Sequence, residues 1–230
     1  MNGLPDMFAE IRYRLGRGPI STWFWVTDRL RDAAHDRRFG IFSSKRQGQS
    51  KLGFSSREFS PYQATSYPDL YDLFRSIHRN PNDVFLDYGA GMGRVVCIAA
   101  TYAFRSVIGI EMSSELCEIA RRNVELVRGK LLCQDVRILN CDAAEYELPG
   151  DASIIYLFNP FGGSVLSQVL RNIRQSLARN PRNLRLIFHG TLSTDHFRRE
   201  AAHHPWLTLQ AQTVLRTGTL ALTYSNSAQQ

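Results

Sequence analysis

The sequence lacks several patterns, and each absence narrows the class of protein. No apolar run approaches the ~20 residues of a membrane span, and the first residues lack the basic and apolar regions of a secretory signal. The four cysteines (Cys97, Cys117, Cys133 and Cys141) form no C-x-x-C pair and no zinc-site spacing. Each lies in or beside an apolar segment, which predicts buried free thiols and fits a reducing cytoplasm. We therefore expect a cytoplasmic protein with no membrane span and no metal site.

Lysine is also scarce, with three among the 28 basic residues, and the net charge of +7 is unevenly spread. Residues 61–152 carry 9 basic and 13 acidic side chains, whereas residues 1–60 carry 11 and 6, and residues 153–230 carry 8 and 2. If the two basic flanks meet in space, they could attract phosphate or an acidic partner. The sequence shows no helix-turn-helix, zinc finger or RNA-binding aromatic motif. Nucleic-acid binding is therefore possible but less favoured than a solvated basic surface.

The most informative segment is a short apolar strand followed by glycines at alternate positions. Residues 84–88 lead into Gly89, Gly91 and Gly93, and an apolar helical run begins at Arg94. A strand, a glycine turn and a helix form the first unit of a nucleotide-binding α/β sheet. Glycine can take positive φ and lets a ligand lie against the backbone, and a helix start offers free N–H groups. The third glycine comes one residue too early for the dinucleotide pattern G-x-G-x-x-G.

Acidic residues end the next two apolar segments. Residues 107–111 end in Glu111, 24 residues after Asp87, and residues 136–142 end in Asp142. A carboxylate at the end of the second strand is placed to accept hydrogen bonds from both hydroxyls of a ribose. Three successive strands that each end in an acid predict one polar edge of a parallel sheet.

The remaining segments continue the alternation of strands and helices and then end in a hairpin. Residues 153–158 form an apolar fourth strand, Ser113 and Ser164 are expected to cap the following helices, and residues 184–190 form a fifth strand ending near His189. Residues 206–215 and 219–224 then read as an antiparallel hairpin. His189 could serve as a base at the mouth of a pocket, but a lone histidine at a strand end is more often structural.

The D-x-G-x-G-x-G turn, the spaced acids and the terminal hairpin resemble the class I S-adenosylmethionine-dependent methyltransferases. Over residues 60–226 the resemblance implies a Rossmann-like, doubly wound α/β fold: a mostly parallel seven-stranded sheet with a C-terminal antiparallel hairpin. It implies S-adenosyl-L-methionine as cofactor. The residues that it places against the cofactor are Asp87, Gly89, Ala90, Gly91, Gly93, Arg94, Glu111, Met112, Asp142, Ala143 and Asn159.

The turn after the fourth strand bears on the acceptor. Asn159, Pro160 and Phe161 resemble the Asp/Asn/Ser-Pro-Pro-aromatic motif of amino-group methyltransferases, although the second proline is missing. The resemblance makes these three residues the catalytic candidates and favours a nitrogen acceptor. The layout also loosely resembles the small lysine methyltransferases without a SET domain. A plain strand-to-helix turn with a buried Phe161 remains open, as does a small-molecule acceptor.

Residues 1–59 lie outside the resemblance. We expect them to form an N-terminal helical extension and lid segment, with the methyltransferase domain over residues 60–230. Class I methyltransferases commonly fold the chain before their first strand over the cofactor, which makes Tyr62, Thr65 and Tyr67 lid candidates. Arg94 puts a cation at a helix N-terminus against the dipole. We expect Arg94 to pair with an acid or with the methionyl carboxylate of the cofactor.

Three classes of function follow from these patterns. The favoured class is a methyltransferase acting on a nucleophile of a protein or a small molecule, possibly nitrogen. A nicotinamide-dependent oxidoreductase is disfavoured by the glycine spacing and the terminal hairpin. The third class is a non-catalytic binding protein with a cofactor fold, and the intact glycine turn argues against it.

Overall fold

The computed structural model describes residues 19–44, 63–159, 161–190 and 195–226. The chain alternates strands and helices and ends in a hairpin. The elements are α2 (Pro19–Phe39), α3 (Tyr67–Ser76), β1 (Val84–Tyr88), α4 (Arg94–Ala99), β2 (Ser106–Glu111), α5 (Ser114–Val127), the 3-10 turn η2 (Arg128–Lys130), β3 (Val136–Asn140), β4 (Ala152–Phe158), α6 (Gly163–Arg179), β5 (Arg185–Gly190), α7 (Asp195–Ala202), β6 (Leu207–Val214) and β7 (Leu220–Asn226). Among these described helices, none is long and apolar enough to cross a bilayer.

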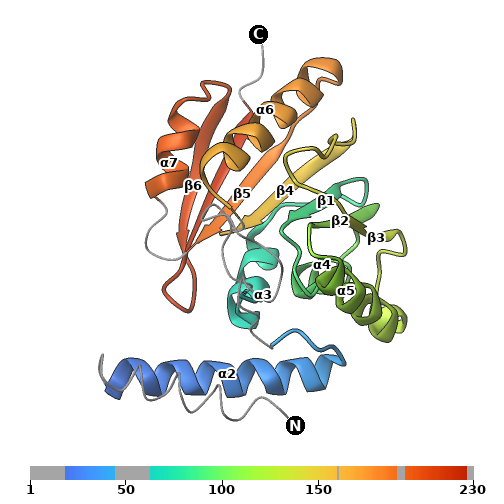
Figure 1. The fold of residues 1–230 in the computed structure, drawn as a ribbon, viewed down its shortest axis with the longest axis vertical. Helices are drawn as coiled ribbons and strands as arrows, with labels where there is room; N and C mark the ends of the chain where they lie inside the picture. The colour runs from blue at the N-terminus through green and yellow to red at the C-terminus, as the bar shows by residue number, and fades with distance from the viewer. Residues whose placement is uncertain (1–18, 45–62, 160, 191–194, 227–230) are drawn as a thin grey trace.

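The strands form one seven-stranded sheet in the order β3-β2-β1-β4-β5-β7-β6 (Figure 1). The first five positions pair in parallel, and β7 pairs antiparallel with both β5 and β6. The chain leaves β1 toward β2 and β3 on one side, and later places β4 on the other side. Where the strand order reverses in this way, α/β sheets bind ligands in the crevice outside the carboxyl ends of the strands, here β1 and β4. The predicted fold class, with its terminal hairpin, is confirmed.

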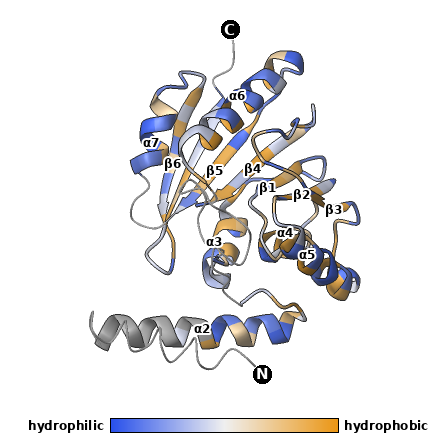
Figure 2. Cartoon of the chain, in the orientation of Figure 1, coloured by the Kyte–Doolittle hydropathy of each residue, from blue (hydrophilic) through white to orange (hydrophobic). Residues whose placement is uncertain are grey.

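Two cores lie on opposite faces of this sheet. Helices α3, α4 and α5 bury apolar side chains against one face, and α6 and α7 bury theirs against the other. Strands β1 and β2 are buried along their whole length and are largely apolar, because helices cover both faces of the sheet there (Figure 2). The edge strand β6 is exposed along most of its length. Helix α2 crosses one end of the molecule, with α3 between it and the sheet (Figure 1). The sheet is therefore a rigid frame that fixes where its carboxyl edge lies.

Two local expectations need correction. Ser164 does not cap α6, which begins at Gly163 after an extended Gly162 with no side-chain cap. The third strand ends at Asn140 and not at Asp142, because its partner β2 ends at Glu111, opposite Asn140. Ser113 does cap α5, since its side chain accepts a hydrogen bond from the backbone of Leu116.

Gly109, in the middle of β2, allows α4 to pack closely on the sheet. A Cβ at this position would lie 2.8 Å from Val96 Cγ2, 2.9 Å from Ala90 Cβ and 3.0 Å from Ile138 Cδ1. We predict that Gly109→Ala lowers the free energy of unfolding by roughly 1–3 kcal/mol, because the overpacked core must shift. Urea denaturation would measure the loss.

Gly129→Ala is the matched control, since a Cβ there would meet nothing within 4 Å. It should change stability by no more than about 0.5 kcal/mol, as surface substitutions usually do. Equal effects of the two substitutions would contradict the packing described for Gly109.

Candidate active site at the carboxyl edge of the sheet

The glycine turn after β1 has a backbone that favours glycine at three positions. Gly89, Gly91 and Gly93 take φ values of 78°, 55° and 80°. The amides of Gly89 and Ala90 each donate to the carbonyl of Ile110 at 2.9 Å, which fastens the turn to the end of β2. Gly93 is also packed tightly, because a Cβ there would lie 2.9 Å from Ala120 Cβ in α5. The sequence therefore encodes a turn whose path requires glycine and which is fastened to the carboxyl end of β2.

Glu111, the last residue of β2, holds this turn from the neighbouring strand. Its Oε2 accepts from the amide of Gly91 at 2.9 Å, and its Oε1 accepts from the amide of Ser113 at 2.8 Å. The side chain is 8% exposed. Burial raises the pKa of Glu111, and hydrogen bonds from the amides of Ser113, Gly91 and Met112 oppose that rise. Each carboxylate oxygen can accept a further hydrogen bond from a ligand.

Asp87, near the end of β1, has a buried oxygen that needs a partner. The residue is 2% exposed, and its Oδ2 accepts no hydrogen bond from any described residue. Burial, and then the charge of Glu111, raise the pKa of Asp87 well above its usual value. A buried acceptor without a donor is costly. A hydrogen-bond donor on a bound ligand would satisfy it.

The ends of β2 and β3 are held together by Asn140, which the sequence analysis did not single out. Its amide nitrogen donates to the carbonyls of Glu111 at 3.0 Å and of Met112 at 2.8 Å. Asp142 follows in a turn, where its Oδ1 accepts from the amide of Ala144 at 2.8 Å, and Ala143 is buried. Register pairing of Glu111 with Asn140 thus brings the predicted residues after β2 and β3 to one edge.

The turn after β4 carries backbone strain. Asn159 has a φ of 40°, the only positive value for a non-glycine residue among the described ones. Asparagine tolerates this left-handed conformation better than most residues, and such strain concentrates at functional sites. Phe161 is buried with its ring 6.3 Å from that of Tyr88. Pro160, the third catalytic candidate, lies outside the described residues.

Comparisons with known proteins agree with this geometry. The sequence model of the family described as "Histone methylation protein DOT1" matches residues 51–143, which contain the glycine turn and both acids after β2 and β3. A Caenorhabditis elegans protein named "Histone-lysine N-methyltransferase, H3 lysine-79 specific" is 38% identical over 53 residues. That match covers 23% of this chain and 6% of the relative, so the chain corresponds to a small part of that protein.

Solved structures share the fold over about 70% of the chain. An RNA methyltransferase from Salinibacter ruber, in complex with S-adenosyl-L-homocysteine, is 19% identical with a TM-score of 0.54, covering 73% of this chain and 96% of its own. A ribosomal protein L11 methylase from Lactobacillus delbrueckii is 15% identical with a TM-score of 0.52, covering 69% and 76%. These structures show that the chain has the fold of the class I S-adenosylmethionine-dependent methyltransferases. The match of residues 51–143 to the DOT1 family model agrees with the predicted family, enzyme class and cofactor.

The lid candidates that the structure describes lie beside α4. Tyr62 falls outside the described residues, whereas Thr65 and Tyr67 are buried. One neighbour of the Tyr67 ring is the guanidinium of Arg94, whose Cζ lies 4.3 Å from the ring centroid, and another is the stacked ring of His35, at 5.0 Å. The cation that the structure places against Tyr67 is therefore Arg94.

Of the two partners expected for Arg94, an acid or the methionyl carboxylate of the cofactor, the structure shows acids. Its Nη1 lies 2.7 Å from Asp32 Oδ2, and its Nη2 lies 3.4 Å from Asp36 Oδ1. Both acids are on α2, which the sequence analysis did not connect with the glycine turn. Whether Arg94 also contacts the cofactor stays a prediction.

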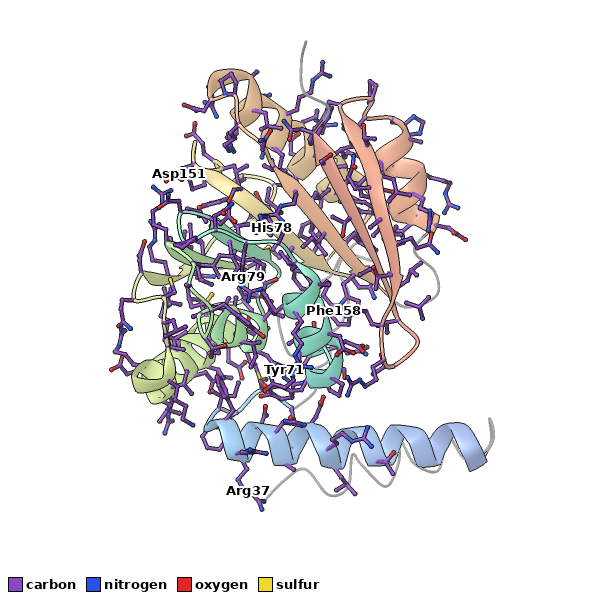
Figure 3. The ribbon with its side chains drawn as sticks, turned by 180° about the vertical axis from the view of Figure 1, so that it is seen from behind. Arg37, Tyr71, His78, Arg79, Asp151 and Phe158 are labelled. Carbon is purple, nitrogen blue, oxygen red and sulfur yellow. The ribbon has the colours of Figure 1, made fainter. Side chains whose placement is uncertain are left out.

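His189 is held in a closed network and does not offer a free base. Its Nδ1 lies 2.7 Å from the Tyr156 hydroxyl, its Nε2 lies 2.8 Å from Thr219 Oγ1, and its side chain is 1% exposed. The ring of Phe158, labelled in Figure 3 beside α3, lies 4.8 Å from it. The hydroxyl of Thr219 in turn donates a hydrogen bond to Oδ2 of the buried Asp69 at 2.9 Å. Both ring nitrogens are occupied, so the structural interpretation of His189 fits the geometry.

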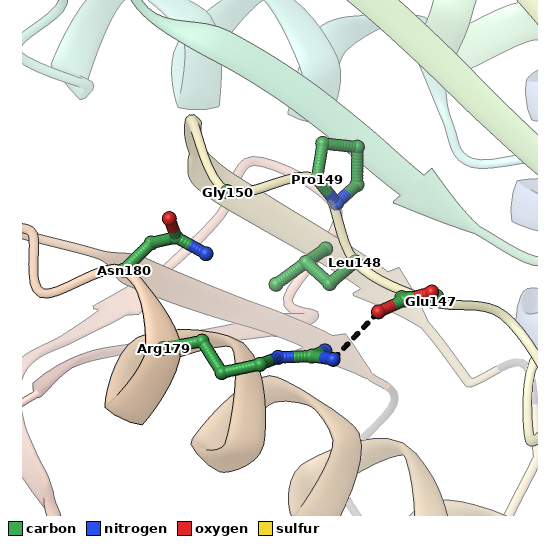
Figure 4. A pocket seen from close by; sticks show the side chains of 6 residues that line it. All are labelled: Glu147, Leu148, Pro149, Gly150, Arg179 and Asn180. Atoms are coloured by element: carbon green, nitrogen blue, oxygen red, sulfur yellow. Dashed lines mark ion pairs between the residues drawn. The ribbon is translucent and has the colours of Figure 1, made fainter.

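A cavity of about 400 Å³ lies at the opposite edge of the sheet, before β4 begins (Figure 4). Its lining consists of Glu147, Leu148, Pro149, Gly150, Arg179 and Asn180. Glu147 and Arg179 form an exposed ion pair across it at 2.7 Å. The described residues hold no cluster of three or more metal-ligating side chains. Its position before β4 separates this cavity from the candidate site at the carboxyl edge of the sheet.

The buried His189 predicts acid sensitivity. Burial lowers its pKa to about 4, partly opposed by the charge of Asp69. The unfolded chain therefore binds a proton below its ordinary pKa of about 6.5, while the folded protein binds it only near the lowered value. The stabilisation is complete above the unfolded pKa and is lost as pH falls toward the folded one, by up to about 1.4 kcal/mol per pH unit.

We predict that His189→Gln flattens the dependence of unfolding free energy on pH between about 6.5 and 4, relative to the native protein. Urea denaturation at several pH values measures the two slopes. The exposed His203→Gln substitution serves as control and should leave the slope unchanged. A steep slope retained in His189→Gln would contradict the buried neutral imidazole.

Proposed function

We propose that this protein transfers the methyl group of S-adenosylmethionine to a nitrogen of a protein side chain, with lysine as the favoured acceptor. The observation that carries this proposal is the match of the DOT1 family over residues 51–143, the segment that builds the glycine turn and its acids. The name of the Caenorhabditis elegans relative, a histone-lysine N-methyltransferase, supports a lysine acceptor.

The residues of the crevice fit the cofactor. In this proposal the backbone of Gly89, Ala90, Gly91 and Gly93 lies along it, and the free acceptor sites of Glu111 bind the ribose hydroxyls. Asp142, beside Met112 and Ala143, bonds the adenine amino group. The buried Oδ2 of Asp87, which lacks a donor among the described residues, accepts a hydrogen bond from the ligand.

The cofactor supplies a methyl group bonded to a sulfonium, a leaving group that needs no acid. The task of the protein is then mainly to place the nucleophile about 3 Å from the methyl and in line with the departing sulfur. Asn159 stands at the carboxyl end of β4, beside the crevice, in a conformation fixed by a φ of 40°. We assign it the role of accepting a hydrogen bond from the amine, with Pro160 and Phe161 shaping the turn.

The acceptor amine must lose its proton before it attacks. His189, at the end of β5, has both nitrogens engaged by Tyr156 and Thr219 and is buried. We therefore assign it a supporting role beneath the site, with the proton lost to solvent. The cytoplasmic location, and the division into an extension over residues 1–59 and a domain over residues 60–230, stay predictions.

A first test is binding of S-adenosylhomocysteine by isothermal titration. We predict that Glu111→Gln raises the dissociation constant about 10- to 100-fold, because hydrogen bonds to a charged acceptor contribute about 1.5–3 kcal/mol. Glu118→Gln, an exposed acid on α5, is the control and should leave the affinity unchanged. NAD should not bind either protein. Equal affinities of Glu111→Gln and Glu118→Gln would contradict the ribose role of Glu111.

A second test identifies the acceptor by following labelled methyl groups into fractionated cell extract and purified histones. We predict label on protein lysine, and a turnover at least tenfold lower in Asn159→Gly with little change in S-adenosylhomocysteine affinity. Glycine keeps the left-handed backbone, so the loss would report the missing amide. Label confined to nucleic acid or small molecules would overturn the protein acceptor, and full turnover of Asn159→Gly would overturn its role.

A further inference from the structure

We propose that the end of α2 and residues 41–44 are part of the cofactor site, and that Arg94 is the positioning residue that couples their docking to cofactor affinity. This inference rests on the proposed binding of the cofactor at the glycine turn. It assigns a role to the N-terminal extension, for which the sequence analysis offered only a lid.

The position of Arg94 is unfavourable unless other groups compensate. It is the first residue of α4, directly after Gly93, and it is 2% exposed. A cation there opposes the helix dipole, and burial removes its hydration. Its place in the sequence therefore implies that acceptors are brought to it from elsewhere in the chain.

The side-chain acceptors come from the chain before α3. Nη1 donates to Asp32 Oδ2 at 2.7 Å, Nε donates to Ser43 Oγ at 2.8 Å, and Nη2 donates to Ser44 Oγ at 2.9 Å. Nη1 also donates to the carbonyl of Thr65 at 2.8 Å. The guanidinium of Arg94 therefore bonds three segments to the start of α4: α2, the residues directly after α2, and the residues directly before α3.

Asp36 connects the same segments through a second set of hydrogen bonds. Its carboxylate accepts hydrogen bonds from the amide and hydroxyl of Ser43 and from the hydroxyls of Ser44 and Tyr67, at 2.6–2.7 Å. It is 6% exposed and lies 3.4 Å from Nη2 of Arg94. Without Arg94, this buried carboxylate would lose its counter-charge. The conformation of residues 41–44 therefore depends on Arg94, the first residue of α4.

A second connection joins the same segment to the turn itself. The amide nitrogen of Asn123, on α5, donates to the carbonyls of Met92 at 2.8 Å and of Phe42 at 3.1 Å. Its oxygen accepts from the amide of Phe42 at 2.9 Å. Phe42 and the glycine turn thus share one buried side chain. Because one side chain bonds both segments, we expect a ligand that stabilises the turn to stabilise the docked extension as well.

The test compares Asp32→Asn and Arg94→Lys with the native protein. Asp32 contacts Arg94 from α2 and is 20% exposed, so its amide variant should fold. Arg122→Ala, an exposed arginine of α5, is the control. Two quantities are measured: the dissociation constant for S-adenosylhomocysteine, and hydrogen exchange of residues 32–44 with and without that ligand.

We expect the ligand to slow exchange of residues 32–44 at least threefold in the native protein and in Arg122→Ala. Asp32→Asn and Arg94→Lys should exchange faster there without ligand and bind it at least threefold more weakly. Native affinity in both variants, or exchange of residues 32–44 that ignores the ligand, would overturn the coupling. If the native protein fails to bind S-adenosylhomocysteine, the proposed function fails, while unchanged ligand-free exchange in both variants would separately overturn the role of Arg94.

Discussion

The carboxylate of Glu111 is the interaction on which the site depends. One of its oxygens fixes Gly91 in the turn after β1, and the other fixes Ser113 at the start of α5. Glycine brings conformational freedom and no side-chain contacts of its own, so the turn depends on such hydrogen bonds from its backbone. The buried acid at the end of the neighbouring strand accepts one of them. Each of its oxygens can still accept one further hydrogen bond.

The sheet makes such a short-range arrangement possible. Parallel pairing sets Asp87 opposite Gly109, two residues before Glu111, so the ends of β1 and β2 coincide. Gly109 lets α4 approach the sheet closely, and Gly93 lets α5 approach the turn. Strand register, two missing side chains and one carboxylate therefore determine the path of the glycine turn. Arg94 extends this frame to α2, since the acceptors of its buried charge include Asp32 and Ser43.

The sequence predicted what depends on local pattern. Apolar strands ending in acids place those acids at one edge because parallel strands share their carboxyl ends, and the terminal hairpin followed from its turn residues. The predicted cap at Ser164 was wrong because the helix already begins at Gly163, after an extended Gly162. The third strand was drawn too long because pairing, and not composition, decides where a strand ends.

Other parts of the site depend on contacts between distant segments. Asp32 and Ser43 lie 62 and 51 positions from Arg94, and no periodicity links them. The burial of Asn123 could have been predicted from the sequence, because this polar residue lies on the apolar face of α5 with Leu116, Ala120 and Val127. Such a residue is buried only if it satisfies backbone groups nearby. Tyr62 and Pro160 lie outside the described residues, so their assigned roles stay predictions.

The most direct measurement is a crystal structure with S-adenosylhomocysteine bound. The account predicts both ribose hydroxyls within about 2.6–3.2 Å of the Glu111 oxygens, the ligand against Gly89–Gly93, and a donor on Asp87 Oδ2. A ligand bound elsewhere, or a ribose turned away from Glu111, would contradict the central claim that this carboxylate organises the cofactor site.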